Sequence, residues 1–256
     1  MAELHEAVAG FDRAADEYER GRPEYPEAAI EFLASNLPIH DTTTVVELAS
    51  GTGKLTRAIA RTGPWRLIAV EPTAGMRRVF RRMLPDVSLV AGTAERIPIV
   101  DRGADVVIVG QAFHWFTADR ALAEIARVLR PGGALALLWN MRDQSVPWVA
   151  RLGEILKEHE AKEAPKGRAH TWKPVLAASP RFSPFATREF RHAPMIDPAG
   201  LIDRVLSVSF VALLPPEAKR AVEGQVRDLL LSDPALRGKD RFEFPYRTEV
   251  YWTHTR

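Results

Sequence analysis

The chain has 256 residues, of which 46% are hydrophobic and 27% charged, and its formal net charge is +2. This length and composition suit one large globular domain or two small ones with an ordinary apolar core. The absence of cysteine excludes disulfides, thiolate catalysis and cysteine zinc sites. No two of the seven histidines have the helical spacing of a zinc motif, so no metal site is expected.

No apolar run reaches the roughly 20 residues of a membrane helix, and the start of the chain is too acidic for a signal peptide. We therefore expect a cytoplasmic protein with no membrane partner. The only clustered arginines are the pairs Arg77/Arg78 and Arg81/Arg82, which fall at i, i+4 on one predicted helix. Such spacing is typical of a solvated helix face, and no nucleic-acid partner is expected. The sequence leaves the oligomeric state open.

Strand-like and helix-like segments alternate from about residue 23 to residue 140. The apolar periodicities and turn residues predict helices over 23–36, 55–61, 72–83 and 118–129, and strands over 44–49, 66–71, 87–91, 104–110 and 134–140. Parallel neighbours in a sheet need a crossover connection, which is usually helical. The alternation therefore predicts an α/β fold with a doubly wound, mostly parallel sheet.

Beyond residue 140 the pattern changes, because prolines interrupt segments that are otherwise helical or irregular. We expect a helical cap or insertion over about 142–180 and 194–238, and closing strands over about 185–191 and 242–254. The whole chain, 1–256, is then a single domain. Its motif-bearing core spans 41–141 and follows an N-terminal helical segment, 1–40.

The stretch ELASGTGKLT, residues 47–56, occupies the first predicted strand-to-helix turn. It is not the phosphate loop GxxxxGK[ST], because Leu48 replaces the first glycine and Leu55 replaces the metal-binding hydroxyl. The dinucleotide fingerprint GxGxxG is also incomplete, since Thr56 stands at its third glycine position. Lys54 is therefore expected to be an exposed residue in the first turn of a helix.

Two acids near this turn indicate a different ligand. Glu47 ends the first predicted strand, where its charge disfavours a pyrophosphate and suits a cationic ammonium group. Glu71 ends the second strand, 18 residues after Gly53, where an acid hydrogen-bonds ribose hydroxyls. An adenosine ligand with amino-acid functionality and no phosphate satisfies both observations, and S-adenosylmethionine is one such ligand.

Five motifs follow one another along the chain: ELASGTG at 47–53, AVEP at 69–72 with Met76 after it, AGTAE at 91–95, QAFHW at 111–115 and EIARVLRPGG at 124–133. Together they resemble class I S-adenosylmethionine-dependent methyltransferases, in particular the small-molecule group that includes trans-aconitate methyltransferase-like proteins. The resemblance implies a Rossmann-like sheet of seven strands with a helical cap. It also implies transfer of a methyl group from S-adenosylmethionine to a small-molecule acceptor, a carboxylate or another oxygen, with S-adenosylhomocysteine as product.

The resemblance also implies roles for individual residues. Glu71 would bind the ribose, and Tyr18 and Arg22 would close over the cofactor, with Arg22 pairing its carboxylate. The alternative is that Tyr18 packs on the core and Arg22 lies at the surface. The family commonly has aspartate at the position of Thr93, so the adenine amine would meet the backbone of Ala94 instead. The expected cofactor contacts are Tyr18, Arg22, Glu47, Ala49, Ser50, Gly51, Gly53, Glu71, Pro72, Met76, Thr93, Ala94, Glu95 and Gln111.

Methyl transfer from a sulfonium needs alignment and exclusion of water more than a dedicated nucleophile. Gln111 begins the loop after the fourth strand, close to the expected position of the methyl group. His114 is the candidate general base for a protonated acceptor, and the alternative is that it caps the next helix or plugs the pocket. The expected acceptor contacts are Trp115, Asn140, Arg142, Trp148 and Trp172.

Two other functions remain open at this point. One is a protein of the same fold that binds the cofactor without catalysis. The other is a nicotinamide oxidoreductase, which the positions of Glu47 and Thr56 disfavour.

Overall fold

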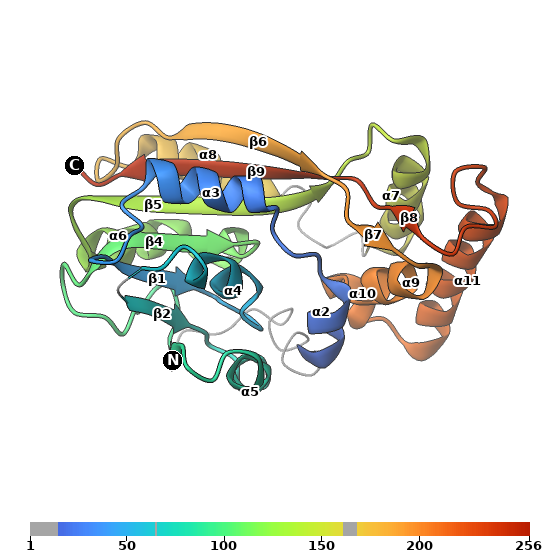
Figure 1. Cartoon of the computed structure of the whole chain (residues 1–256), viewed down its shortest axis with the longest axis horizontal. Coiled ribbons are helices and arrows are strands. Elements are labelled where there is room, and N and C mark those ends of the chain that lie inside the picture. The colour runs from blue at the N-terminus through green and yellow to red at the C-terminus, as the bar shows by residue number, and fades with distance from the viewer. Residues whose placement is uncertain (1–14, 65, 161–167) are drawn as a thin grey trace.

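The computed structural model describes residues 15–64, 66–160 and 168–256 (Figure 1). Residues 1–14 of the predicted N-terminal helical segment and residues 161–167 of the predicted cap lie outside this part. The strands are β1 (Thr44–Leu48), β2 (Arg66–Val70), β3 (Ser88–Val90), β4 (Ala104–Gly110), β5 (Leu129–Arg142), β6 (Ala186–His192), β7 (Met195–Ile196), β8 (Phe242–Glu243) and β9 (Tyr246–His254). The helices are α2 (Ala15–Gly21), α3 (Glu27–Asn36), α4 (Lys54–Ala60), α5 (Ala74–Met83), the 3₁₀ turn η1 (Phe113–Trp115), α6 (Ala118–Val128), α7 (Pro147–His159), α8 (Arg168–Ala178), α9 (Pro198–Leu206), α10 (Ser209–Ala212) and α11 (Pro216–Ser232).

The main sheet has seven strands in the order β3-β2-β1-β4-β5-β9-β6. The first five run parallel to their neighbours, and β9 pairs antiparallel with β5 and β6. The chain winds outward from β1 in one direction and from β4 in the other, so the predicted doubly wound α/β fold is confirmed. The switch between β1 and β4 is where open sheets of this kind bind ligands, at the carboxyl ends of the strands.

Alternate residues of each central strand face opposite layers of helices, as strand geometry requires. Val45 and Val106 pack with α3 and α4 on one face, and Val46 and Val107 pack with α6 and α8 on the other. The central strands are therefore apolar throughout, as expected of parallel strands that are covered on both sides.

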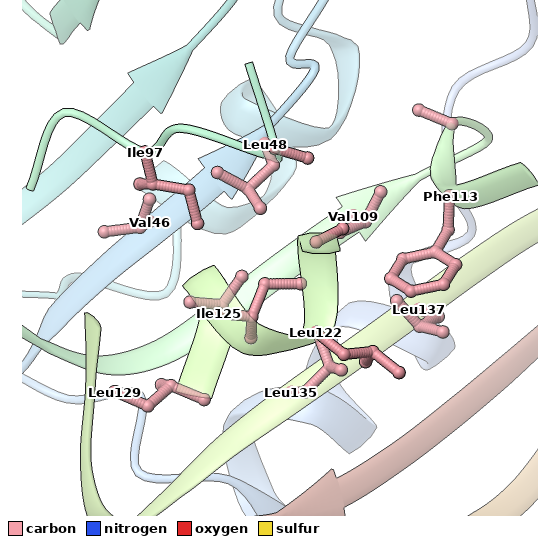
Figure 2. Close-up of a cluster of buried hydrophobic side chains, with 14 of the residues drawn as sticks. Val46, Leu48, Ile97, Val109, Phe113, Leu122, Ile125, Leu129, Leu135 and Leu137 are labelled. Atoms are coloured by element: carbon pink, nitrogen blue, oxygen red, sulfur yellow. The ribbon is translucent and has the colours of Figure 1, made fainter. Parts of the chain in front are cut away.

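Figure 2 shows the second of these faces, where side chains of α6 meet the strands. Leu122 and Ile125 of α6 lie against Val109 of β4 and Leu135 of β5. These two helical positions are three residues apart and share one side of α6, which is the spacing of an amphipathic helix. Packing of this kind fixes the carboxyl ends of β1 and β4 on which the site is built.

Two sequence-based predictions of element boundaries are wrong. The helix expected over 23–36 begins only at Glu27, because Pro26 restricts Tyr25 to extended backbone. The single strand expected over 242–254 is split at Pro245, which has no N–H to donate. As a result β8 pairs with β7 in a separate two-stranded sheet, and β9 alone closes the main sheet.

Helices α7, α9, α10 and α11 gather beyond one end of the main sheet (Figure 1) and share a hydrophobic core of their own. Trp148 of α7 is buried in this core against Phe242 and Phe244. Helix α8 packs on the main sheet instead, where Trp172 stacks on Trp139 with ring centroids 4.8 Å apart. The predicted role of Trp148 and Trp172 as pocket walls is therefore replaced by a packing role.

We predict that Trp172→Ala lowers the free energy of unfolding by about 3–5 kcal/mol, the usual cost of deleting a buried tryptophan. The side chain is 2% exposed and joins α8 to the sheet. Urea denaturation measures the loss, and Trp172→Phe is the conservative control, for which a smaller loss is expected. Small changes in stability together with weakened ligand binding would contradict the packing role.

Candidate active site

A cavity of about 40 Å³ lies at the switch point, above the carboxyl ends of β1 and β4. It is covered by residues 15–26, comprising α2 and the extended segment after it, which we call the strap. The lining residues are Tyr18, Arg22, Pro23 and Tyr25 of the strap, Glu47, Ala49, Ser50, Gly51, Thr52, Lys54 and Leu55 around the turn after β1, and Gly110, Gln111 and Asn140 at the ends of β4 and β5. The structure thus brings together most residues expected at the methionine end of the cofactor.

The turn after β1 uses left-handed backbone conformations. Gly51 has φ 57° and Gly53 has φ 91°. A Cβ on Gly53 would lie 2.6 Å from a methyl carbon of Leu84, whereas a Cβ on Gly51 would meet only Tyr18, at 4.0 Å. Gly53 is therefore needed for packing, and Gly51 keeps the backbone open toward the cavity.

Two non-glycine residues at the cavity are also left-handed. Ala49 has φ 51° and Gln111 has φ 59°, directly after β1 and β4 respectively. Such conformations cost roughly 1–3 kcal/mol each and persist where the surrounding structure fixes them, commonly at functional sites. Both residues were predicted to contact the cofactor.

Glu47 is the central charged group of the site. It is 3% exposed, and its Oε2 accepts a hydrogen bond of 2.5 Å from the hydroxyl of Thr56. Burial raises the pKa of Glu47 to about 8; the Thr56 hydrogen bond works against this rise, and the nearby Glu71 adds to it. At neutral pH the carboxyl group is protonated, and a cation brought beside it would favour its ionised form.

Glu71 is held by the loops on either side of it. Its Oε2 accepts from the Gly51 N–H at 2.9 Å, and its Oε1 accepts from the N–H and hydroxyl of Thr73 at 2.9 and 2.8 Å. Burial raises its pKa although these hydrogen bonds oppose the rise. A carboxylate has about four lone-pair positions, so one remains on Oε2. Glu71 can therefore accept from one ribose hydroxyl without losing an existing bond, and a second would replace one of them.

Arg22 reaches over the cavity from the strap. Its guanidinium lies 5.1 Å from the ring centroid of Tyr18, and Nη2 donates to the Ser207 carbonyl at 3.1 Å. Its Nε is buried and has no hydrogen-bond partner in the described part of the chain. Within residues 15–64, 66–160 and 168–256, no carboxylate lies within 4.0 Å of this guanidinium. Arg22 is thus a partly buried cation with donors left for an anionic ligand.

The expectation that Lys54 is exposed is wrong. It is 9% exposed, and its Nζ donates to Glu24 at 2.8 Å. Arg57, one turn later on α4, pairs with Glu24 and with Glu19 at 2.9 and 2.8 Å. These ion pairs fasten the strap to α4. Sequence could not show them, because the two glutamates come from a segment about 30 residues earlier that folds across the site.

The residues expected around the adenine do not line this cavity. Met76 is buried in a small cluster that includes Tyr18, and Ala94 is buried in the core next to α6. Glu95 accepts a hydrogen bond of 2.9 Å from the Thr117 N–H at the start of α6. Pro72 and Thr93 are partly exposed at the ends of β2 and β3. Their contacts with an adenine remain predictions.

Gln111 and Asn140 lie side by side at the base of the cavity. The amide of Gln111 donates to the Asn140 carbonyl at 3.0 Å. The Asn140 side chain donates to the Glu24 carbonyl at 3.2 Å and accepts from the Thr248 hydroxyl at 2.6 Å. Asn140 therefore ties the strap to the sheet, and its amide orientation is fixed by partners on both sides.

His114 lies outside the residues that line the cavity. The indole N–H of Trp139 donates to its Nδ1 at 3.4 Å, and its ring lies 4.8 Å from that of Trp115. Trp115 itself packs against the core on the α6 side of the sheet. The role of His114 as a general base stays a prediction.

Sequence reasoning missed several side chains of the site, among them Thr52, Thr56 and Tyr25. Thr56, treated only as a lost glycine, is the hydrogen-bond donor to Glu47. Tyr25 places its hydroxyl over the end of β4, where a Cβ on Gly110 would lie 2.4 Å from it. Burial raises the pKa of Tyr25 well above its usual range, so its hydroxyl stays protonated. A hydroxyl residue nine positions after an acid is too common in sequences to predict the hydrogen bond from Thr56 to Glu47. No sequence pattern predicts that Tyr25 lies over the end of β4.

The donor set fits a zwitterionic amino-acid group attached to a nucleoside. Glu47 suits an ammonium and Arg22 suits a carboxylate, and the buried hydroxyls of Ser50 and Thr52 have no hydrogen-bond partner among the residues that the structure describes. One acceptor position on Glu71 is open to a ribose hydroxyl. An open α/β sheet with this set at its switch point defines a Rossmann-like fold whose site fits an adenosyl amino acid.

Comparisons with known proteins agree with this class. A family model described as a methyltransferase domain matches residues 46–137. An uncharacterised methyltransferase of Mycobacterium tuberculosis is 40% identical over 242 residues, which cover 93% of this chain and 92% of that protein. A methyltransferase-like protein of Schizosaccharomyces pombe is 33% identical over 241 residues, covering 94% and 93%. A solved structure described as a type II methyltransferase of Anaeromyxobacter dehalogenans shares the fold with a TM-score of 0.63 and 23% identity, covering 91% of this chain and 97% of that one.

The chain belongs to the class I S-adenosylmethionine-dependent methyltransferases and is an enzyme of that family. In the part of the chain that the structure describes, no helix has the length and apolar character needed to span a membrane.

We predict that Glu47→Gln changes how stability depends on pH. Unfolded Glu47 has a pKa near 4.5 and the folded group near 8, so the folded state keeps a proton that the unfolded state has lost. Between these values the free energy of unfolding of the wild type falls with rising pH, with a limiting slope of about 1.4 kcal/mol per unit from this group. Glu47→Gln removes that slope, so the variant is more stable than the wild type at pH 8.

Urea denaturation at several pH values between 5 and 8 measures this difference. Glu31→Gln, an exposed change on α3, is the matched control and should leave the profile unchanged. Parallel profiles for the wild type and Glu47→Gln would contradict the assignment of a buried, protonated Glu47.

Proposed function

We propose that this enzyme uses S-adenosylmethionine to methylate an oxygen atom of a small molecule, most simply a carboxylate oxygen. The observation that carries the cofactor assignment is that Glu47 and Arg22 border one cavity. Glu47 is a buried acid that would gain from a cationic partner, and Arg22 is a partly buried cation whose Nε has no hydrogen-bond partner among the described residues. A pyrophosphate would suit Arg22 but not Glu47, because it brings no cation to that carboxyl group.

The proposed cofactor contacts follow from these groups. Glu47 binds the ammonium group, and Arg22 binds the carboxylate through its planar donor fork. Ser50 and Gly51 line the path of the methionine portion, and Glu71 accepts from the ribose. Pro72, Met76, Thr93, Ala94 and Glu95 remain the proposed surroundings of the adenine.

The bound cofactor supplies a methyl group on a positively charged sulfur, which is already activated for displacement. The protein then has to orient the attacking oxygen and exclude water. Gln111, Asn140 and Tyr25 surround the space next to the proposed methyl position. A carboxylate is ionised at neutral pH and needs no general base. The engagement of the His114 Nδ1 by Trp139 is compatible with this acceptor.

The strap has to move when the cofactor binds. The cavity has a volume of about 40 Å³. Sites for larger ligands measure roughly 300–1,000 Å³. Since Tyr18 and Arg22 lie over the cavity, we infer that the strap opens to admit the cofactor and closes on it with Arg22 in contact.

We predict that S-adenosylmethionine and S-adenosylhomocysteine both raise the melting temperature, whereas NAD and NADP leave it unchanged. The absence of a shift with the first two would refute the cofactor assignment, and a shift with NAD would favour the oxidoreductase alternative. Arg22→Gln should weaken binding about tenfold or more, which is the usual effect of losing a charge-assisted hydrogen bond. Arg20→Gln, an exposed change in the last turn of α2, is its control.

A metabolite screen that follows the gain of one methyl group by mass tests the catalytic part of the proposal. We expect methyl esters of small acids among the products. Cofactor binding without turnover of any acceptor would support the alternative of a binding protein of the same fold.

A further inference from the structure

His192, the last residue of β6, is a partly buried titratable side chain on the edge strand of the main sheet. Its ring stacks on that of Tyr246, with centroids 5.5 Å apart. Its Nδ1 lies 3.4 Å from the hydroxyl oxygen of Thr248, which is fully buried. Its Nε2 is buried and has no hydrogen-bond partner among the described residues. The two ring nitrogens therefore have different surroundings, and only Nδ1 has a polar neighbour.

The register of the sheet brings His192 close to the cavity. Thr248 of β9 lies opposite Asn140 of β5, which lines the cavity. Two residues earlier on β9, Tyr246 lies opposite Arg142 on one side and His192 on the other. Residues two apart on a strand share one face, so both rows face the same side of the sheet. Thr248 thus stands between His192 and Asn140.

The carbonyl of Glu24 in the strap fixes the orientation of the Asn140 side chain. A carbonyl oxygen can only accept, so the group of Asn140 that faces it at 3.2 Å is the NH₂. The Asn140 Oδ1 is then directed to Thr248, whose hydroxyl donates to it at 2.6 Å. Since a hydroxyl has a single proton, Thr248 can only accept a hydrogen bond from His192.

This order of donors determines which nitrogen of His192 carries the proton. A hydrogen bond to the lone pair of Thr248 requires a proton on Nδ1, and Nε2 is then bare. Burial lowers the pKa of His192 below its usual value, so the ring is neutral at pH 8. In the other neutral tautomer, a bare Nδ1 would compete with Asn140 for the one proton of Thr248.

Asn140 transmits this constraint to the strap. Its amide holds the Glu24 carbonyl, and the next residue, Tyr25, lies with its hydroxyl over the end of β4. The Glu24 side chain is held separately by Lys54 and Arg57 of α4. The bond from Asn140 therefore fixes the backbone of the strap where Tyr25 enters the cavity.

A packing role alone accounts for only part of these contacts. Strand β6 is already joined to β9 by a continuous antiparallel ladder from Ala186 to His192. Stacking on Tyr246 needs an aromatic ring, and a phenylalanine would supply one. Neither contact requires a nitrogen beside the hydroxyl of Thr248.

We propose that His192 is a positioning residue for the methyl-transfer site. It donates from Nδ1 to Thr248, Thr248 donates to Asn140, and Asn140 holds the Glu24 carbonyl so that the strap closes over the cofactor. The link to cofactor binding rests on the proposed function, whereas the order of donors is a property of the free enzyme.

The tautomer of His192 is measured by ¹⁵N NMR at pH 8 on enzyme labelled at its histidine nitrogens. The spectrum of His192→Asn identifies the signals that belong to this residue. We expect the proton on Nδ1, because Thr248 has no second proton to donate. A neutral ring with its proton on Nε2 would overturn the proposal, and this measurement needs neither a ligand nor a stable packing variant.

Two substitutions separate positioning from packing. His192→Asn keeps a donor near the place of Nδ1 but loses the ring, whereas His192→Phe keeps the ring and loses the donor. We expect His192→Phe to bind S-adenosylhomocysteine about threefold to tenfold more weakly, the usual effect of losing one hydrogen bond, and His192→Asn to bind within twofold of the wild type. Calorimetry measures both affinities. Hydrogen exchange of the bound enzyme should increase in residues 15–26 of His192→Phe only.

The matched control is His254→Phe, a change on β9 opposite Ala134, six residues from Asn140 on β5. It should bind S-adenosylhomocysteine as the wild type does. Undiminished affinity in His192→Phe, or weakened affinity in His192→Asn, would overturn the proposal. Failure of the wild type to bind S-adenosylhomocysteine would instead refute the proposed function, and the NMR measurement would still decide the order of donors.

Discussion

The site depends on one buried carboxyl group, Glu47 at the carboxyl end of β1. The seven-stranded sheet places it at the switch point between β1 and β4, where helices on both faces exclude water. Burial without a cation makes its ionised form unfavourable, and this is why its pKa rises to about 8. Burying Glu47 without a cation therefore lowers the stability of the free enzyme, and a bound ammonium group would remove this cost. Functional sites commonly reduce stability in this way.

Ion pairs also explain how the strap is held against the rest of the protein. Glu19 and Glu24 are neutralised by Lys54 and Arg57, so paired charges hold the strap to α4. Arg22, which lies between these two glutamates in the chain, has no carboxylate within 4.0 Å among the described residues. The strap is therefore ion-paired toward α4, while its Arg22 lacks a counter-ion that an anionic ligand would supply.

Much of the fold could be predicted from the sequence, because apolar strands alternate with amphipathic helices and the glycine turn follows a buried strand. The loop residues of the site could be predicted for the same reason, since they lie next to each other in the chain. Contacts that join distant segments could not: Lys54 is buried only because the strap crosses it, and Trp172 is a core residue only because α8 folds back onto Trp139. No sequence pattern around Arg204 predicts its contacts. Its position is set by the packing of α9 against α2, where Arg204 donates a hydrogen bond to the Gly21 carbonyl.

The central claim is that Glu47 is protonated in the free enzyme and ionised when the cofactor is bound. Isothermal titration calorimetry with S-adenosylmethionine at pH 7, repeated in buffers of different ionisation enthalpy, measures the protons exchanged on binding. Because the pKa of Glu47 lies near 8 before binding and falls beside an ammonium group, close to one proton should be released to the buffer. Binding with no proton release at pH 7 would contradict the account.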